Sequence, residues 1–132
     1  MPHFTLSGRA DAPVEEVWKL LFDPTRFPEW WAGVQTVRTD GPDGYTAWMQ
    51  DDPDFPWPQQ LRGNRAKGRV TISCQVTYID FVWQLNEDGP GTRIDVHITM
   101  PDSQAHHLDG EREIITTSLA RLATLAETTA TT

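Results

Sequence analysis

Regular alternation of apolar and polar residues near the C-terminal end of the chain most constrains how this sequence folds. From position 93 to 99, each odd position is polar or charged, and apolar residues follow at the even positions to 100. Successive side chains of a strand point to opposite faces, so this segment predicts a β-strand with one buried face. The face expected to be buried carries Ile94, Val96, Ile98 and Met100. One-faced strands are typical of antiparallel sheets, so another element must cover the apolar side.

Other segments have the pattern of antiparallel strands joined by turns. Residues 86–91, Asn-Glu-Asp-Gly-Pro-Gly, form a strong turn signal that joins 81–85 to 92–100 as a hairpin. The residues Asp-Gly-Pro-Asp-Gly at 40–44 predict a second turn. Further strands are predicted over residues 4–9, 34–39, 45–50 and 69–80.

The inward face of these strands has few groups that could perform acid or base chemistry. In the strand starting at Arg69, alternation turns every second residue from Val70 to Tyr78 inward, and Trp83 faces inward in the next strand. Tyr78 and Cys74 are the only obvious polar side chains on this inward face. A hydrolase or isomerase usually needs a placed acid, base or nucleophile. The pattern therefore favours binding over catalysis.

Helical segments complete the predicted architecture. Pro13 suits the first position of a short helix, and a second short helix can follow Asp23-Pro24. The C-terminal helix is predicted to begin near Gln104 and is clearest from Glu111. Its apolar stripe carries Ile115, Leu119, Leu122 and Ala126. We expect one domain over residues 1–132, with 128–132 frayed.

Charge and composition exclude several functions. The chain has 132 residues and a formal net charge of −8, which disfavours binding to nucleic acid or to anionic lipid surfaces. No apolar run approaches the length of a membrane-spanning helix, and residues 1–9 lack the pattern of a signal peptide. Cys74 is the only cysteine, so an intrachain disulfide is impossible. We expect a cytoplasmic monomer or homodimer without membrane insertion.

The segment 51–60 is unusual because three prolines alternate with Phe55 and Trp57. Prolines cannot donate to a ladder, so the segment is predicted to be a loop or an edge segment. Three roles remain open for it. It can be a stiff lid over a pocket, a cover that blocks pairing at the sheet edge, or a contact for a partner protein.

The start of the last helix has two interpretations, a metal site and a solvated helix start, and the metal site is the weaker one. His107 and Glu111 are four residues apart and share one helix face. No HExxH pattern is present, and a third ligand would have to come from elsewhere. We expect a solvated helix start, with no metal and no cofactor.

Several segments resemble the START-like superfamily, also called Bet v 1-like or SRPBCC, and its polyketide cyclase/dehydrase-like bacterial members. The resemblance lies in residues 10–18 (ADAPVEEVW), 23–24 (DP), 27–31 (FPEWW), 81–85 (FVWQL), 91–94 (GTRI) and 118–123 (SLARLA). It implies an α+β helix-grip fold, in which a curved antiparallel sheet wraps around a long C-terminal helix. Two short N-terminal helices then close one end, and a cavity lies between sheet and helix. The family supplies no shared catalytic motif to carry over, and the segment 51–60 departs from its pattern.

These observations predict a binding domain for a hydrophobic or aromatic small molecule, lipid- or polyketide-like, held in an internal cavity. The predicted lining residues are Trp30, Trp48, Trp57, Tyr78, Trp83, Met100, Ile115 and Leu119. Trp48 is in doubt by strand parity, because Tyr45, Ala47 and Met49 share the opposite face. Two alternatives remain. One is a metal-free cyclase or dehydratase with Tyr78 as proton relay, and the other is a protein-interaction module that uses residues 51–60.

Overall fold

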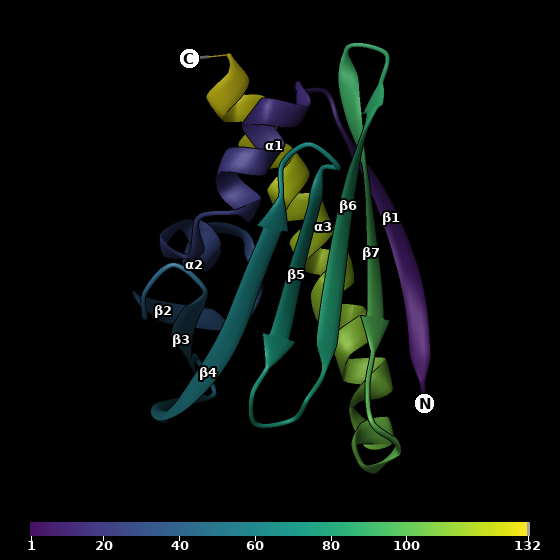
Figure 1. Ribbon diagram of the computed structural model, residues 1–132. Coiled ribbons are helices and arrows are strands. Elements are labelled where there is room, and N and C mark those ends of the chain that lie inside the picture. Colours follow the sequence, from purple (N-terminus) through teal and green to yellow (C-terminus); the bar gives the residue numbers. More distant parts are fainter. Residues whose placement is uncertain (132) are drawn as a thin grey trace.

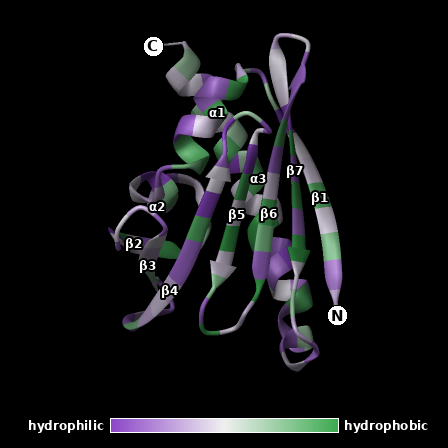
Figure 2. Cartoon of the chain, in the orientation of Figure 1, coloured by the Kyte–Doolittle hydropathy of each residue, from purple (hydrophilic) through white to green (hydrophobic). Residues whose placement is uncertain are grey.

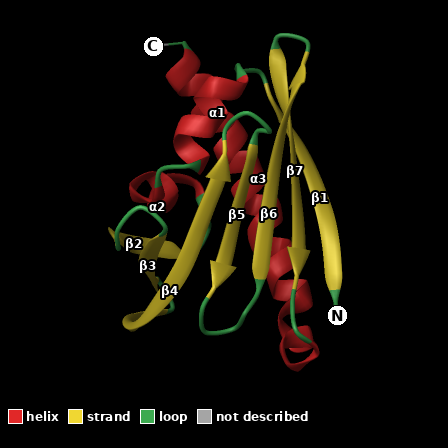
Figure 3. Cartoon of the chain, in the orientation of Figure 1, coloured by secondary structure: helices red, strands yellow, loops and turns green. Residues whose placement is uncertain are grey.

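The computed structural model describes residues 1–131 as a seven-stranded antiparallel sheet with helices on one side (Figures 1 and 3). The strands are β1 (His3–Ala10), β2 (Val34–Thr39), β3 (Gly44–Met49), β4 (Asp52–Asn64), β5 (Arg69–Cys74), β6 (Asp80–Asp88) and β7 (Gly91–Thr99). The helices are α1 (Val14–Leu21), α2 (Phe27–Trp30) and α3 (Leu108–Ala130), with 3₁₀ turns η1 (Pro24–Arg26) and η2 (Asp102–His107). The predicted helix-grip architecture is confirmed.

The sheet has the order β1-β7-β6-β5-β4-β3-β2, so the N-terminal strand pairs with the last strand of the chain. In Figure 1 the long helix α3 runs behind the sheet, with α1 and α2 beside it. Irregular pairing interrupts the β2–β3 and β3–β4 ladders. Bulges of this kind increase strand bending. They bend the β2–β4 end of the sheet, where the candidate site lies.

The alternation that predicted β7 and β6 matches the core. All four predicted inward residues of β7 are fully buried, as is Trp83 on β6. The four residues of the predicted α3 stripe are also buried. Figure 2 shows hydrophobic segments on β5 and β7, whereas β4 is largely hydrophilic. Antiparallel strands with one wet face pack their apolar side chains against α3 and α1, as the sequence pattern requires.

The strand predicted over 69–80 is shorter than expected, and two inward assignments are wrong. β5 ends at Cys74, and the chain turns before β6 begins at Asp80. Cys74 is buried as predicted, but Val76 is exposed and Tyr78 is 66% exposed. Tyr78 has a φ of 61°, a left-handed conformation that a strand residue does not adopt. Because of this turn, the alternation of inward and outward side chains ends at Cys74 and does not apply to Val76 and Tyr78.

The segment 51–60 is not a loop, because most of it forms the first half of β4. This half pairs with β3, whereas β5 joins β4 only from Gln59 onward. The Pro58 carbonyl accepts a hydrogen bond from the Gln75 N–H (2.9 Å), on the side away from β3. The β3–β4 register shifts between Trp57 and Asp52, so Pro53 and Pro56 lie at an irregularity of the ladder, where proline is tolerated. This half of β4 has one strand partner, which confirms the edge-segment alternative and explains how its prolines are tolerated.

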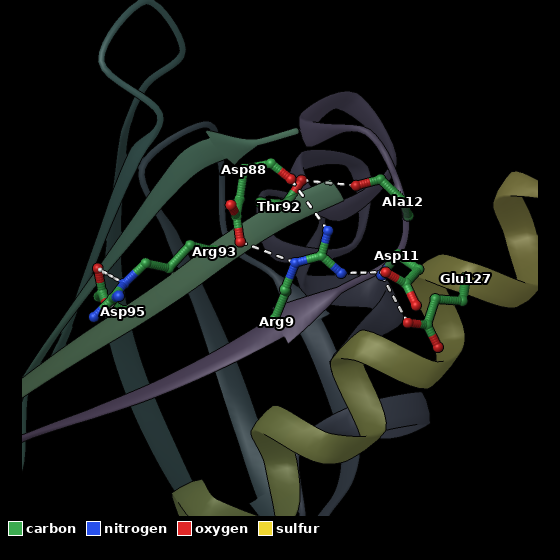
Figure 4. A network of polar contacts seen from close by, with 8 residues as sticks. All are labelled: Arg9, Asp11, Ala12, Asp88, Thr92, Arg93, Asp95 and Glu127. Atoms are coloured by element: carbon green, nitrogen blue, oxygen red, sulfur yellow. Dashed lines mark hydrogen bonds and ion pairs between the residues drawn. The ribbon is translucent and has the colours of Figure 1, made fainter. Parts of the chain in front are cut away.

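A polar network ties the end of α3 to the sheet (Figure 4). The Arg9 guanidinium binds the carboxylates of Asp11 and Asp88, which joins β1 to the β6–β7 turn. The Asp11 N–H donates to the Glu127 carboxylate (2.7 Å). α3 therefore stays in contact with the loop after β1 close to its C-terminal end. Thr128 to Ala130 of the tail that was expected to fray belong to α3, and Thr132 lies outside the described residues.

Candidate ligand-binding pocket

A pocket of about 360 Å³ lies between β3, β4, β5 and the start of α3. Its wall is mainly apolar and aromatic, and the aromatic members come from four different segments. The apolar and aromatic lining residues are Trp31, Ala32, Gly33, Val34, Tyr45, Ala47, Met49, Trp57, Ile79, Phe81 and Ile114. The polar lining residues are Asp51, Asp52, Gln59, Cys74, Thr77, His107 and Glu111. A few polar groups in an apolar wall are typical of small-molecule sites.

Trp31 separates this pocket from the packed core. Its ring lies 5.3 Å from the ring of Trp30 and 5.3 Å from that of Phe81, between centroids. Trp30 is fully buried behind it and donates its indole N–H to the Leu20 carbonyl (3.1 Å). Adjacent residues at a helix end point in different directions. One tryptophan of the pair therefore fills the core, and the other faces the pocket.

The loop that carries Trp31 is anchored to α3 by a buried serine. The Ser118 hydroxyl donates to the Ile114 carbonyl (2.7 Å) and accepts the Ala32 N–H (2.9 Å). Ser118 is fully buried on the helix face that covers the sheet. Because both hydrogen bonds are satisfied inside the protein, they hold this pocket wall at a defined distance from α3.

A row of polar side chains crosses the floor of the pocket from strand to strand. Tyr45 on β3 lies opposite Gln59 on β4, and Gln59 lies opposite Cys74 on β5. Tyr45 is 4% exposed and Gln59 is 9% exposed. The Tyr45 hydroxyl forms no hydrogen bond with any described residue. Burial raises the pKa of the Tyr45 phenol above its ordinary value, so the group is a neutral donor.

Glu111 faces this floor from the first turn of α3. It is partly buried and has neither an ion-pair partner nor a hydrogen bond among the described residues. Burial raises the pKa of the Glu111 carboxyl to about 7. His107 lies one turn earlier and lines the same pocket. The helix start that was expected to be solvated thus contributes two titratable groups to the site.

Among the predicted lining residues, only Trp57 lines this pocket. Its indole N–H is buried without a hydrogen-bond partner among the described residues, and its ring lies 4.8 Å from that of Phe55. The other candidates lie elsewhere. Trp30, Trp83, Met100 and Ile115 are fully buried in the core. They pack where α2 and α3 fill the sheet, so no pocket remains beside them.

Three more candidates lie away from the pocket. Tyr78 is on the exposed turn between β5 and β6, which removes it from the pocket as a proton relay. Trp48 is half-buried, and the Arg38 guanidinium lies 5.4 Å from its ring, as the parity argument against it anticipates. Leu119 lies over β1 beside a separate hollow between β1 and α3.

Two functional candidates were missed for different reasons. Tyr45 has the inward parity of Ala47 and Met49, so strand alternation contained the necessary signal. Glu111 carries no such signal, because charged residues in a first helical turn are usually solvated. Only the approach of α3 to the curved strands places its carboxyl in the pocket. No cluster of three or more potential metal-ligating side chains occurs among residues 1–131.

Comparison with known proteins agrees with this geometry. Residues 1–127 match the family described as "Polyketide cyclase / dehydrase and lipid transport". The chain belongs to this family. The match covers every strand and nearly all of α3, so the pocket is built entirely from family sequence. No curated protein matches the chain.

Solved structures of family-like proteins share the fold at low sequence identity. XoxI from Bacillus cereus is 20% identical, with 94% of each chain covered and a TM-score of 0.77. The di-domain aromatase/cyclase BexL of the BE-7585A biosynthetic pathway is 15% identical, with a TM-score of 0.79. That match covers 96% of this chain and 47% of BexL. A START superfamily protein from Mycobacterium smegmatis is 14% identical, with coverages of 98% and 97% and a TM-score of 0.69.

Proposed function

We propose that this protein binds a hydrophobic or aromatic small molecule, lipid- or polyketide-like, in the pocket between β3, β4, β5 and α3. The observation that carries the proposal is an unfilled pocket of about 360 Å³ with aromatic walls and inward polar groups. Burying an apolar ligand there releases water from both surfaces, and the polar groups set its orientation. Family membership supports the same class of ligand.

The polar groups suit a ligand with a largely apolar body and few hydrogen-bonding atoms. The Tyr45 hydroxyl has no protein partner among the described residues, so it can donate to a ligand acceptor. Gln59 uses its amide N–H₂ in a contact with the Trp57 carbonyl (3.4 Å). Its amide oxygen remains an acceptor.

Binding can be tested with neutral apolar fluorescent probes, using tryptophan emission and probe emission as readouts. Ala47 is 2% exposed and lines the pocket, so Ala47→Phe should fill the space and weaken binding at least about tenfold. Thr71→Leu on the outward face of β5 is the matched control and should bind normally. No saturable signal across a broad probe panel, or equal binding by both variants, would contradict the proposal.

A cyclase- or dehydratase-type activity is a second candidate, and one observation favours it. Glu111 has a pKa of about 7 and shares the pocket with the neutral Tyr45 hydroxyl. A carboxyl poised near neutral pH is suited to general acid–base catalysis. Glu111→Gln should then abolish turnover of a bound polyketide-like substrate while leaving its affinity within about threefold. Retained turnover would remove this activity from consideration.

The interaction-module alternative has weaker support. Phe55 is 41% exposed, but its neighbour Trp57 is partly buried against the pocket. The pocket is also unfilled, which favours ligand binding over a role confined to the protein surface. None of the helices in the described part of the chain has the length and apolarity needed to cross a lipid bilayer. The predicted cytoplasmic location and oligomeric state stay predictions.

A further inference from the structure

The charges that face the pocket are of one sign apart from a histidine. Glu111 faces it from α3, and Asp51 and Asp52 lie at its rim where β3 leads into β4. The remaining titratable lining groups are His107, Cys74 and Tyr45. No lysine or arginine is among the described residues that line the pocket. A carboxylate ligand would therefore meet acidic groups without a fixed cation to pair with.

Two basic residues, one on α3 and one on β2, make their contacts elsewhere. Arg112 follows Glu111 in α3, but its guanidinium lies 4.6 Å from the ring of Phe4 on β1. Arg38 on β2 binds Asp40 (2.9 Å) and lies against Trp48, on the outward side of the strand. The helix and strands therefore present acids to the pocket and hold these arginines away from it. The net charge of −8 adds to the negative electrostatic potential there.

Two further observations point to a ligand rather than to solvent. The Glu111 carboxyl lies in the pocket wall without any ion-pair partner among the described residues. The deeply buried Tyr45 side chain turns an unpartnered hydroxyl to the same space. Neither polar group is sealed off from the pocket, so a ligand can reach both of them. A ligand cation beside Glu111 supplies the missing partner.

The walls suit a cation with an aromatic or apolar body. Trp31, Trp57 and Phe81 line the pocket from three different segments. Aromatic rings attract cations through the negative potential of their faces, most strongly when water is excluded. We infer that the pocket selects an amphiphilic amine, with its ammonium beside Glu111 and its apolar body between the aromatic walls, over the matching carboxylate. This inference rests on the proposed binding function and names the charge class of its ligand.

Selectivity can be measured with three probes of one skeleton: naphthylethylamine, naphthylethanol and naphthylacetate. Isothermal titration calorimetry at about pH 8 should rank them amine, alcohol, acid, with the amine at least about tenfold tighter than the alcohol. Glu111→Gln should remove the preference, so that this variant binds the amine no more tightly than the alcohol. Glu113→Gln, an exposed acid on the same helix, is the matched control and should retain the preference.

The pH dependence supplies a second readout. Because Glu111 loses its proton around neutral pH, the amine should bind about tenfold more weakly at pH 5.5 than at pH 8. His107 lines the same pocket, so His107→Gln is needed to separate the contributions of the two residues. The pH dependence should persist in His107→Gln and largely disappear in Glu111→Gln.

Failure of the charge inference can be distinguished from failure of the proposed binding function. If the neutral probe panel binds but the amine binds no tighter than the alcohol or the acid, the charge inference is wrong and the binding function stands. If no neutral probe binds, the proposed function itself fails. A preference for the amine that survives Glu111→Gln would also overturn the inference, because the attraction would then come from the rim acids or the net charge.

Discussion

At the scale of single residues, Glu111 is the group whose position is hardest to explain by stability alone. Its carboxyl faces an apolar pocket without an ion pair among the described residues, and burial raises its pKa to about 7. A raised carboxyl pKa means that ionising this residue costs folding free energy. Such a cost is typical of residues kept for function.

This cost predicts how stability depends on pH. Between the ordinary glutamate pKa of about 4.5 and the folded value of about 7, the folded state binds more protons than the unfolded state. The contribution of Glu111 to the free energy of unfolding therefore falls as pH rises through this range and stays low above it. Glu111→Gln should increase stability at pH 8 by about 1–3 kcal/mol and have little effect near pH 4.5.

Urea denaturation of both proteins at the two pH values measures this difference. Glu113→Gln is the control, since its exposed carboxylate should give no comparable change. An equal effect of Glu111→Gln at both pH values would mean that its carboxyl is not desolvated in the folded protein.

At the scale of elements, the β4–β5 turn and α3 each contain a glycine, but in opposite surroundings. Gly68 closes the turn with a φ of 63°, and a Cβ there would lie 2.6 Å from the Leu85 carbonyl oxygen. The Gly68 carbonyl also accepts the Leu85 N–H (2.8 Å). Gly110 lies in the first turn of α3, and a Cβ added there would meet no heavy atom outside its own helix within 4 Å. One glycine is required by geometry, whereas the other only weakens a helix.

The same substitution should therefore act in opposite directions. Gly68→Ala should destabilise the fold by about 2–3 kcal/mol, because both the left-handed backbone and the backbone contact oppose a Cβ. Gly110→Ala should stabilise it by about 0.5–1 kcal/mol through helix propensity. Chemical denaturation of the pair tests this, and equal signs would contradict the proposed packing of the turn against β6.

At the scale of the whole molecule, one half of the sheet forms the packed core and the other half forms the pocket. The β1, β7 and β6 half is packed against α3 with fully buried residues, such as Ile94 and Met100, and leaves little free volume. The β2–β4 end, where two ladders are irregular, contributes much of the pocket wall. A packed half supplies stability, so the open half can retain unpaired polar groups.

This division predicts a ligand-dependent stability of the entire domain. A ligand that binds only the folded state should raise the free energy of unfolding by about 2.7 kcal/mol at a free concentration 100 times its Kd. Thermal unfolding with increasing probe should give a Tm that rises with the logarithm of ligand concentration. In Ala47→Phe, where the pocket is filled, the rise should be clearly smaller at the same concentrations.

Much of the fold follows from local sequence patterns. The alternation in β7, the turn before it and the apolar stripe of α3 each predict an element correctly, because each pattern records which face an element buries. The first half of β4 was harder. Its prolines argue against a ladder only if strands flank it on both sides, and that depends on where β5 ends.

The pocket was less predictable than the fold. Strand parity separates inward from outward side chains, but it does not say whether an inward side chain meets a helix or an empty space. Trp83 and Tyr45 both point inward, yet only Tyr45 lines the pocket. Tyr78 was misplaced because the turn that follows Cys74 ended the alternation before the chain reached it.

Local sequence patterns are enough to specify which elements form, which of their faces are apolar and that no strong catalytic motif is present. Tertiary packing selects which inward residues remain uncovered, and it brings Glu111 across from α3 to the Tyr45–Gln59 row. The difference arises because burial of a face is a local property with a fixed period, whereas a cavity is a mismatch in shape between distant segments. In this protein the mismatch lies at the β2–β4 end of the sheet, where bulges interrupt two ladders.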